Sequence, residues 1–325
     1  AGQGDLFITD VLTHETIQIE DGKVQAFNPL FAPDNQSILY QAADADYAIY
    51  SLSLETGFGK LVTNNLGGAE IVGNWSPDSN RFAYRIQRGI GTDTPLDYLY
   101  YFDLTLNRES FFGSTSTSDQ ALSIPVFSPD GSQIALIQSK GGVADSIIFF
   151  HPDDETFDEI SVPVAPIGNY KLAWSPDGQT IAFIAPVEDN NQIFGLNLAD
   201  QTTTQLTSAE FGTIDFTWSP DGKSMIYAAR RPSDKQATSD LMLLHLDNGE
   251  VGATEQLSGD DTLKHNLAWS SVAADSSESP AGYIAFECEV DSTDNLCMLD
   301  LKTNEIQTLT TYSDSDPIQG FDWAR

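Results

Sequence analysis

The chain has 325 residues, 40% of them hydrophobic, which is enough for packed cores but more length than one ordinary core serves. Its 48 acidic residues against 15 basic ones give a formal net charge of −33, and such a surface repels nucleic acid phosphates and anionic lipid. No apolar run reaches the roughly 18 residues that a membrane span needs. We therefore expect no nucleic acid partner and no membrane span.

Two short strands are predicted first, DLFITDV (5–11) and ETIQI (15–19). A repeat then begins near Asn28, in which an aromatic residue precedes a Pro-Asp turn and an apolar strand. Its copies read FAPDNQSILYQ (31–41), WSPDSNRFAYRI (75–86), FSPDGSQIALIQ (127–138), WSPDGQTIAFIA (174–185) and WSPDGKSMIYAA (218–229), with a degraded copy at Trp269 and a last aromatic at Trp323. The aromatic residues are 44, 52, 47, 44, 51 and 54 residues apart, a period typical of a four-stranded blade.

Each repeat contains four predicted strands. The first ends on the aromatic residue, and Ser-Pro-Asp-Gly then makes a tight turn, because proline presets φ and glycine tolerates positive φ. The second strand is apolar, the third is aliphatic and aromatic, as in YLYYFDL (98–104), and the fourth is more polar, as in EIQTLT (305–310). Such a sheet cannot bury both faces alone, so blades must pack face to face. We expect the recurring aromatic residues to fill the space between neighbouring blades. The sequence predicts an all-β chain that forms a single β-propeller domain over residues 1–325.

The blade count follows from the ends of the chain. Six complete units run from Asn28 to Thr310. The two preceding strands match the third and fourth strands of a blade, and QGFDWAR (319–325) matches a first strand. We therefore expect seven blades, the last one shared by both termini, with six blades as the alternative.

The two cysteines, Cys288 and Cys297, fall in one predicted hairpin, formed by YIAFECEV (283–290), the turn DSTD (291–294) and NLCMLDL (295–301). Their midpoint lies inside the turn, so the two side chains should face each other across the ladder. We expect a disulfide, with two buried free thiols as the alternative. A disulfide would indicate an oxidising compartment.

The FSPDG/WSPDG turn followed by IAF-type strands resembles the TolB-like β-propeller repeat, over about residues 5–325. That group includes the periplasmic TolB propeller, which binds a lipoprotein partner, propellers that cap serine peptidases of the prolyl oligopeptidase class, and some pectate-fragment lyases. The resemblance implies the fold and an extracytoplasmic location: periplasmic, secreted or cell-surface. It leaves the function open, because one fold hosts many functions.

Motifs for catalysis are scarce. No G-x-S-x-G nucleophile elbow occurs. A lyase of the resembling type would need clustered histidines around a divalent metal, and of His14, His151, His245 and His265 only His265 is predicted at the mouth of the channel, so no metal site is predicted. Three acidic groups leave calcium as an alternative to plain turn formation: Asp44 with Asp46, Asp291 with Asp294 and Asn295, and Asp314 with Asp316. We expect no other cofactor.

The few basic residues are more informative, because many fall in loops between second and third strands, which emerge on one face of a propeller together with the loops that enter the first strands. Loops on a rigid scaffold commonly carry binding residues. We predict a binding face that contains Arg85, Arg88, Lys140, Arg230, Arg231, Lys235 and His265. Its partner would be a protein or a polar or anionic ligand. Alternatively, these cations only offset neighbouring aspartates.

These observations favour a non-enzymatic binding or scaffold propeller of a secreted or cell-surface protein, which acts through one loop-bearing face. The alternative is a carbohydrate-active lyase or hydrolase propeller with its site at the channel mouth. For that alternative the candidate residues are Glu70, Asp215, His265 and Asp316. Enzymatic activity stays open, with a non-enzymatic role preferred.

Overall fold

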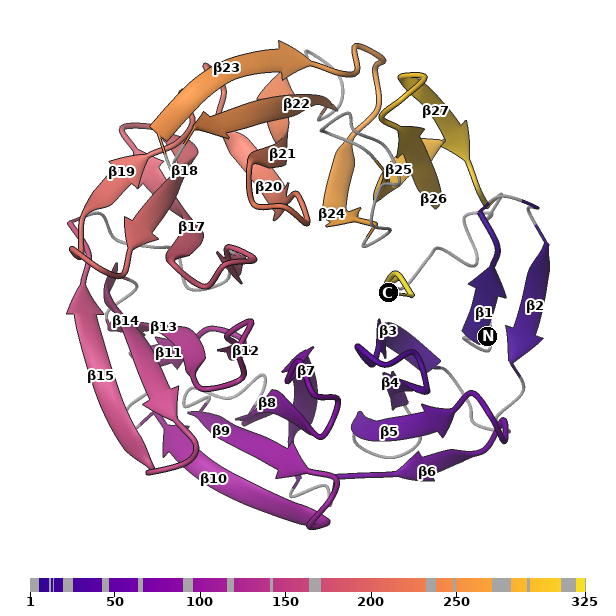
Figure 1. The fold of residues 1–325 in the computed structure, drawn as a ribbon, viewed down its shortest axis with the longest axis vertical. Helices are drawn as coiled ribbons and strands as arrows, with labels where there is room; N and C mark the ends of the chain where they lie inside the picture. The colour runs from indigo at the N-terminus through magenta and orange to yellow at the C-terminus, as the bar shows by residue number, and fades with distance from the viewer. Residues whose placement is uncertain are drawn as a thin grey trace. The chain divides into compact units, whose positions relative to one another are not determined.

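The computed structural model consists of strands joined by turns, and it contains no helix among the residues it describes (Figure 1). No helix in this part of the chain is therefore long and apolar enough to cross a membrane. The described residues are 6–11, 13, 15–19, 26–42, 47–63, 67–89, 96–115, 120–140, 143–163, 171–231, 238–247, 250–270, 282–290, 293–310 and 320–324.

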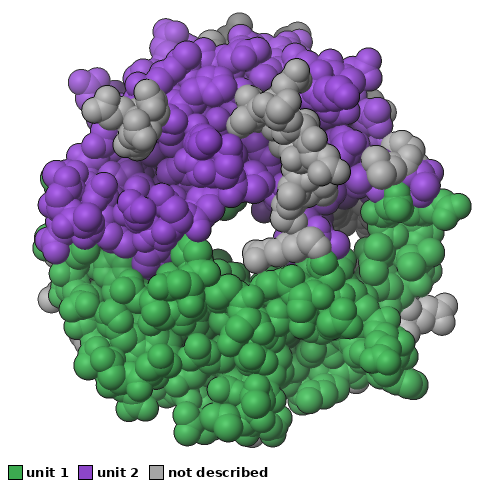
Figure 2. Space-filling view, viewed as in Figure 1, with its two compact units in different colours: residues 1–10, 15–172 green, residues 11–14, 173–325 purple. Residues whose placement is uncertain are grey.

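The chain divides into two compact units (Figure 2). Unit 1 comprises residues 1–10 and 15–172, and unit 2 comprises residues 11–14 and 173–325. The repeated sheets that we number as blades 1–6 are antiparallel, and the strands of each lie in chain order. The fold is a β-propeller with six four-stranded blades; the all-β class and the four-stranded blade confirm the prediction from the repeat.

Unit 1 holds a two-stranded sheet and the first three blades. The two-stranded sheet pairs β1 (Leu6–Thr9) with β2 (Thr16–Ile19). Blade 1 contains β3 (Ala26–Phe31), β4 (Ser37–Ala42), β5 (Ala48–Ser53) and β6 (Gly59–Leu61). Blade 2 contains β7 (Ala69–Trp75), β8 (Arg81–Arg88), β9 (Leu96–Asp103) and β10 (Arg108–Ser114). In blade 3 the first strand is split into β11 (Gln120–Leu122) and β12 (Val126–Phe127), which both pair with β13 (Ile134–Lys140), followed by β14 (Val143–His151) and β15 (Thr156–Ser161).

The other three blades follow in the chain, and all but the start of blade 4 lies in unit 2. Blade 4 contains β16 (Leu172–Trp174), β17 (Thr180–Val187), β18 (Asn190–Asn197) and β19 (Thr203–Gln205). Blade 5 contains β20 (Thr213–Trp218), β21 (Ser224–Arg231), β22 (Thr238–Asp247) and β23 (Glu250–Gln256). Blade 6 contains β24 (Lys264–Trp269), β25 (Tyr283–Val290), β26 (Thr293–Asp300) and β27 (Glu305–Thr308).

In blades 2 to 5 a Ser-Pro-Asp turn closes the first hairpin through its own side chains. In blade 4 the Ser175 hydroxyl donates to Asp177 Oδ1 at 2.6 Å and accepts from the Thr180 backbone N–H at 2.9 Å. The Asp177 carboxylate also accepts from the Gln179 N–H at 3.0 Å. The same pattern recurs at Ser76, Ser128 and Ser219. These bonds satisfy backbone donors within five residues, so the turn is encoded locally.

The repeated tryptophan ties neighbouring blades together. The Trp75 indole N–H in blade 2 donates to the Leu30 carbonyl in blade 1 at 3.1 Å, and that of Trp218 donates to the Ala173 carbonyl at 3.4 Å. The ring of Trp75 also packs among buried apolar side chains of both blades, including Leu39 and Ile49. The prediction that these aromatic residues fill space between blades is confirmed for Trp75 by this contact.

The structure corrects the preferred count of seven blades to the alternative of six. The C-terminal segment forms no strand over its described residues 320–324, and β1 pairs with β2 alone within the described part of the chain. Trp323 still donates its indole N–H to the Ala268 carbonyl, at 3.0 Å. Trp323 therefore makes the same kind of contact with blade 6 that Trp75 makes with blade 1. The ladder of backbone hydrogen bonds that would make this segment a strand is absent over residues 320–324.

The predicted disulfide between Cys288 and Cys297 is present, with 5.9 Å between the Cα atoms, but the expected register is wrong. Cys288 lies opposite Asn295, and Cys297 lies opposite Phe286, so the two cysteines are diagonal neighbours. The cause is the length of β26, which begins at Thr293 inside the predicted turn. Both cysteines are buried in the core between blades 5 and 6.

Candidate functional site

We use the term loop edge for the edge of each blade at which the first strand begins, the second strand ends and the third strand begins. The structure places six of the seven predicted binding residues there. Lys235 lies outside the described residues, and for Lys140 only the backbone, at the end of β13, is described. The others are Arg85 and Arg88 on β8, Arg230 and Arg231 on β21, and His265 on β24.

The two arginines of blade 2 that were predicted as binding residues, Arg85 and Arg88, contact other groups of the protein. Arg85 is 9% exposed, its Nη1 donates to the Leu122 carbonyl of blade 3, and its Nε lies 3.9 Å from Asp97 Oδ1. Asp97 in turn accepts from the Leu122 backbone N–H at 3.0 Å. The Arg88 guanidinium lies over the Tyr98 ring, 4.6 Å from its centroid. Arg85 and Asp97 therefore join blade 2 to blade 3.

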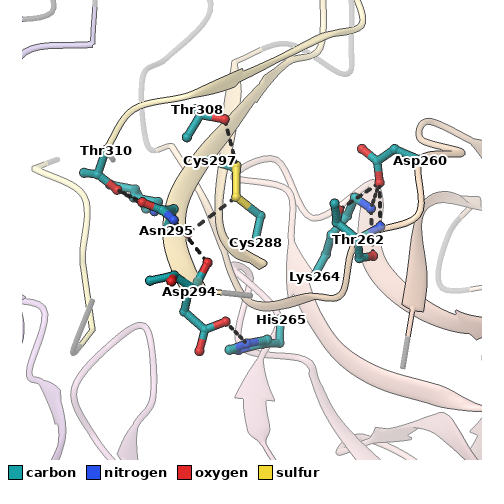
Figure 3. The surroundings of a disulfide bond; sticks show 12 residues. Asp260, Thr262, Lys264, His265, Cys288, Asp294, Asn295, Cys297, Thr308 and Thr310 are labelled. Carbon is teal, nitrogen blue, oxygen red and sulfur yellow. Dashed lines mark hydrogen bonds and ion pairs between the residues drawn. A yellow bond between two sulfur atoms is a disulfide. The ribbon is translucent and has the colours of Figure 1, made fainter. Parts of the chain in front are cut away.

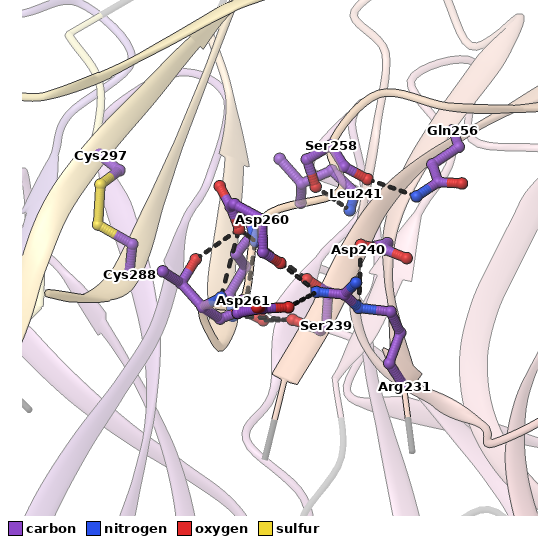
Figure 4. Close-up of polar contacts among 12 residues, drawn as sticks. Arg231, Ser239, Asp240, Leu241, Gln256, Ser258, Asp260, Asp261, Cys288 and Cys297 are labelled. Atoms are coloured by element: carbon purple, nitrogen blue, oxygen red, sulfur yellow. Dashed lines mark hydrogen bonds and ion pairs between the residues drawn. A yellow bond between two sulfur atoms is a disulfide. The ribbon is translucent and has the colours of Figure 1, made fainter. Parts of the chain in front are cut away.

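Blade 5 carries a denser group of charges around Arg231 (Figure 4). The Arg231 Nε lies 3.3 Å from Asp240 Oδ1. The Arg231 Nη2 lies 3.2 Å from Asp261 Oδ1 and also donates to the Asp260 carbonyl. Burial raises the pKa of Asp240, and the Arg231 guanidinium acts against that rise. The contacts hold a largely buried guanidinium against the start of β22, while the neighbouring Arg230 side chain is exposed.

A buried lysine extends the same group of charges. Lys264 is 0% exposed, and its ammonium donates to the Ser239 carbonyl at 3.0 Å, to the Thr262 carbonyl at 3.2 Å and to Asp260 Oδ1. Burial acts to raise the pKa of Asp260, but hydrogen bonds from Lys264 and Thr262 hold it below its usual value. Every donor of the ammonium has a partner, which is the condition for keeping a buried charge. Lys264 is thus a structural cation.

Three titratable groups from three strands meet at the loop edge of blade 6 (Figure 3). His265 on β24 has its Nδ1 3.5 Å from Glu287 Oε2 on β25 and its Nε2 3.8 Å from Asp294 Oδ1 on β26. The Asn266 side chain donates to Glu287 Oε1 at 2.8 Å. Burial raises the pKa of Glu287. Among the described residues, this is the cluster of histidine and carboxylates with metal-ligand spacing.

The acids proposed for the enzymatic alternative have other partners. Glu70 is 0% exposed, accepts from the Thr63 hydroxyl and from the Ile49 N–H at 3.0 Å, and its burial raises its pKa to about 7. Asp215 accepts from the Phe216 N–H at 2.8 Å and from the Leu267 N–H of the next blade at 2.6 Å. Asp316 lies outside the described residues. The carboxylates of Glu70 and Asp215 therefore accept hydrogen bonds from backbone N–H groups and hold neighbouring segments in place.

Sequence reasoning missed the partners of the basic residues. Asp240 and Glu287 were not predicted as site residues, and Asp294 was grouped with Asp291 and Asn295 as a calcium alternative. Asp291, Asp44, Asp46 and the 314–316 pair lie outside the described residues. The sequence did contain one signal for Glu287: it directly follows the apolar residues of a predicted second strand, as in AFE (285–287).

The described histidines do not form the cluster that a metal-dependent lyase would need. His151 lies at the end of β14 and pairs with Asp158 at 2.9 Å, and His245 lies on β22 opposite Ser224, far along its strand from the loop edge. His14 is outside the described part. At the described loop edges His265 is thus accompanied by carboxylates rather than by other histidines.

Comparison with known proteins places the chain in a family. Residues 113–318 match the model of the TolB beta propeller domain, more than half of the chain. The chain therefore belongs to the TolB beta propeller domain family, as its repeats indicate.

Solved structures of several proteins share the fold. TolB from Acinetobacter baumannii is 19% identical, with a TM-score of 0.53 over 76% of this chain and 58% of that one. Oligogalacturonate lyase from Vibrio parahaemolyticus is 12% identical, with a TM-score of 0.66 over 93% of this chain and 84% of that one. An acylaminoacyl peptidase is 13% identical, with a TM-score of 0.66 over 95% of this chain and 48% of that one. The chain thus spans under two thirds of that TolB and about half of the peptidase, and the likeness establishes the fold.

Proposed function

We propose that residues 1–325 act as one propeller domain of a non-enzymatic binding protein, which contacts a protein partner through the loop edge of blade 5. The observation that carries the proposal is the arrangement around Arg231. Three carboxylates, those of Asp240, Asp260 and Asp261, lie around the cations Arg231 and Lys264. A third cation, the exposed Arg230, precedes Arg231 on β21 at the same edge. The edge is locally balanced in charge on a chain whose formal net charge is −33.

A balanced edge suits protein recognition better than capture of a free anion. The Arg231 guanidinium and the Lys264 ammonium are already held by carboxylates and carbonyls, so an anionic ligand would have to displace them. Arg230 is exposed and adjoins this ordered group, which makes it the residue we expect to meet an acidic group of the partner. Rigid support of exposed contact residues lowers the entropy cost of binding.

An extracytoplasmic location is part of the proposal. The Cys288–Cys297 disulfide is stable in an oxidising compartment, and disulfides are rare in the cytosol. Membership of the TolB propeller family supports the same location. A secreted, periplasmic or cell-surface setting also suits the large acidic excess, which keeps a protein soluble.

The test is capture of a partner from the envelope and secreted fractions of the producing organism. Arg230→Glu should weaken retention of a stoichiometric partner by about tenfold or more, since it replaces an attraction by a repulsion. Lys223→Glu is the matched control, because Lys223 is equally exposed but lies in the Ser-Pro-Asp turn at the opposite end of the strand. Equal loss in both variants, no partner for the wild type, or turnover of pectic oligosaccharides would refute the proposal.

A further inference from the structure

The loop edge of blade 6 holds a set of metal-ligand atoms that the proposed binding function does not use. His265, Glu287 and Asp294 each offer one donor atom, and these atoms lie within 4.8 Å of one another. Donors at about 2.0–2.2 Å from a tetrahedral ion are roughly 3.3–3.6 Å apart. The 3.5 Å between His265 Nδ1 and Glu287 Oε2 matches that spacing. The 3.8 Å to Asp294 Oδ1 is measured from the other ring nitrogen, Nε2, and one nitrogen binds a given ion, so for the full set of three donors the separation is the 4.8 Å limit.

The backbone presents these groups through a β-bulge. The β24–β25 register shifts between His265 and Ala268, and Asn266 has a φ of 54°, in the left-handed region. The bulge turns the Asn266 side chain onto Glu287 Oε1, at 2.8 Å, which leaves Oε2 facing His265. The following Leu267 N–H is held by Asp215 Oδ2 at 2.6 Å. Such outer partners orient metal ligands and are typical of built metal sites.

A second constraint comes from the disulfide beside the cluster. Cys288 directly follows Glu287, and Cys297 lies three residues after Asp294, so the bond joins the two strands that carry the carboxylates (Figure 3). Glu287 is 9% exposed and Asp294 is half-buried, so both carboxylates are partly removed from water. Two partly desolvated carboxylates facing one imidazole are best neutralised by a divalent cation.

Blade 1 provides an internal comparison, because it has the same frame with different side chains. There Asn28 has a φ of 51° at the same bulge, and its side chain donates to Gln41 Oε1 at 2.7 Å. Phe27, at the position of His265, meets Tyr47, at the position of Asp294, with ring centroids 5.7 Å apart. The frame therefore forms without a histidine or a carboxylate at these positions.

The donor set of blade 6 is thus not needed to build the blade. Aromatic and amide groups occupy the three corresponding positions of blade 1, as Phe27, Gln41 and Tyr47. Replacing them by an imidazole and two carboxylates places charge at a half-buried edge, which costs free energy unless the charges have partners. A bound cation supplies that partner.

The chemistry of the donors selects the ion. Imidazole suits zinc and other divalent transition metals, whereas calcium and magnesium take oxygen ligands in sets of six or more. We propose that His265, Glu287 and Asp294 form a binding site for a divalent transition metal ion of the zinc type. Three protein ligands leave a coordination position for water or for a group of a bound partner.

The experiment uses the full chain stripped of metal by a chelator. Titration calorimetry with Zn²⁺ should show one site per chain with a dissociation constant of roughly micromolar order, because three ligands rather than four hold the ion. Ca²⁺ and Mg²⁺ should bind at least about tenfold more weakly. Co²⁺ should give visible absorption bands of a site with nitrogen and oxygen ligands, which report coordination directly.

The discriminating variant transplants the side chains of blade 1, as His265→Phe with Glu287→Gln and Asp294→Tyr. It should bind Zn²⁺ at least roughly 100-fold more weakly and give no Co²⁺ bands. Asn266→Gly, which removes the orienting hydrogen bond and tolerates the positive φ at this position, should weaken Zn²⁺ binding by about tenfold. His151→Gln is the matched control, because it removes another histidine–aspartate pair, at 2.9 Å, and should bind Zn²⁺ like the wild type.

Four results would overturn the site. They are no saturable Zn²⁺ binding by the wild type, unchanged binding by the transplant variant, equal loss in His151→Gln, and Ca²⁺ binding as tight as Zn²⁺ binding. If the transplant variant does not fold, Zn²⁺ binding by Glu287→Gln is the test instead. This substitution keeps the hydrogen-bond acceptor for Asn266 and removes one anionic ligand. Partner capture through Arg230 does not depend on this site, so either proposal can fail alone.

Discussion

The buried carboxyl of Glu70 makes the stability of the protein depend on pH in a defined direction. Glu70 lies on β7 between blades 1 and 2, with no exposed surface, and its burial raises its pKa from 4.5 to about 7. Hydrogen bonds from the Thr63 hydroxyl and the Ile49 N–H lower the pKa, and the nearby Glu109 carboxylate, itself bonded to the Tyr84 hydroxyl, raises it. Among the described residues, Glu70 Oε1 has no hydrogen-bond partner.

The magnitude follows from the two pKa values. The folded state binds the Glu70 proton more tightly than the unfolded state, so the free energy of unfolding falls as pH rises from 4.5 to about 7 and is then level. This difference between the pKa values corresponds to roughly 3 kcal/mol. Below pH 4.5 this penalty is absent, because the carboxyl is protonated in both states.

The perturbation is Glu70→Gln, which keeps an acceptor for Thr63 and Ile49 and removes the ionisation. Its free energy of unfolding, measured by urea titration with tryptophan fluorescence from pH 5 to 8.5, should lose this decline and exceed that of the wild type at pH 8 by about 1–3 kcal/mol. The gain is smaller than the full free energy from the pKa difference, by about 1–2 kcal/mol, because the new amide donors are buried without partners. Glu55→Gln, at an exposed position, should follow the wild type. A Glu70→Gln curve parallel to the wild type over this range would falsify the reasoning.

Two further predictions concern the partners at the loop edges of blades 5 and 6. Replacing both Cys288 and Cys297 by Ala, or reducing the disulfide of the wild type, should lower the free energy of unfolding by about 2–3 kcal/mol. The reason is that the disulfide closes a loop over a separation of 9 residues. Equal melting temperatures with and without reductant would contradict this prediction. Lys264→Ala should cost about 2–4 kcal/mol, because it leaves the Ser239 and Thr262 carbonyls unpaired, whereas Lys223→Ala at the surface should stay within about 0.5 kcal/mol. Similar unfolding curves for both lysine variants would show that the Lys264 ammonium is not structural.

Local chemistry made most of the fold readable from the sequence. The Ser-Pro-Asp turn is closed by side chains within five residues, as at Ser175 and Asp177, so its recurrence predicted the hairpins and the period of the blades. The aromatic spacing likewise predicted the contact that Trp75 makes with the preceding blade. Alternation of apolar residues is a property of neighbouring positions and needs no knowledge of distant segments.

The blade count and the register of the disulfide were decided by pairing between segments. Trp323 carries the aromatic signal of a first strand, yet residues 320–324 form no ladder, because a strand exists only where a partner strand supplies hydrogen bonds. Cys288 and Cys297 were correctly paired, but two extra residues at the start of β26 made them diagonal rather than opposite. A two-residue change in where a strand begins is invisible in composition.

The sequence by itself determined the all-β class, the repeated blade and the residues that carry charge. Tertiary structure alone decided which charges meet: Arg231 with Asp240, and His265 with Glu287 and Asp294. The physical reason is that hydrogen bonds within turns act over a few residues, whereas ion pairs act between atoms brought within a few ångströms by folding. The basic residues were therefore found from the sequence, and the carboxylates that give them their roles were found only in the assembled strands.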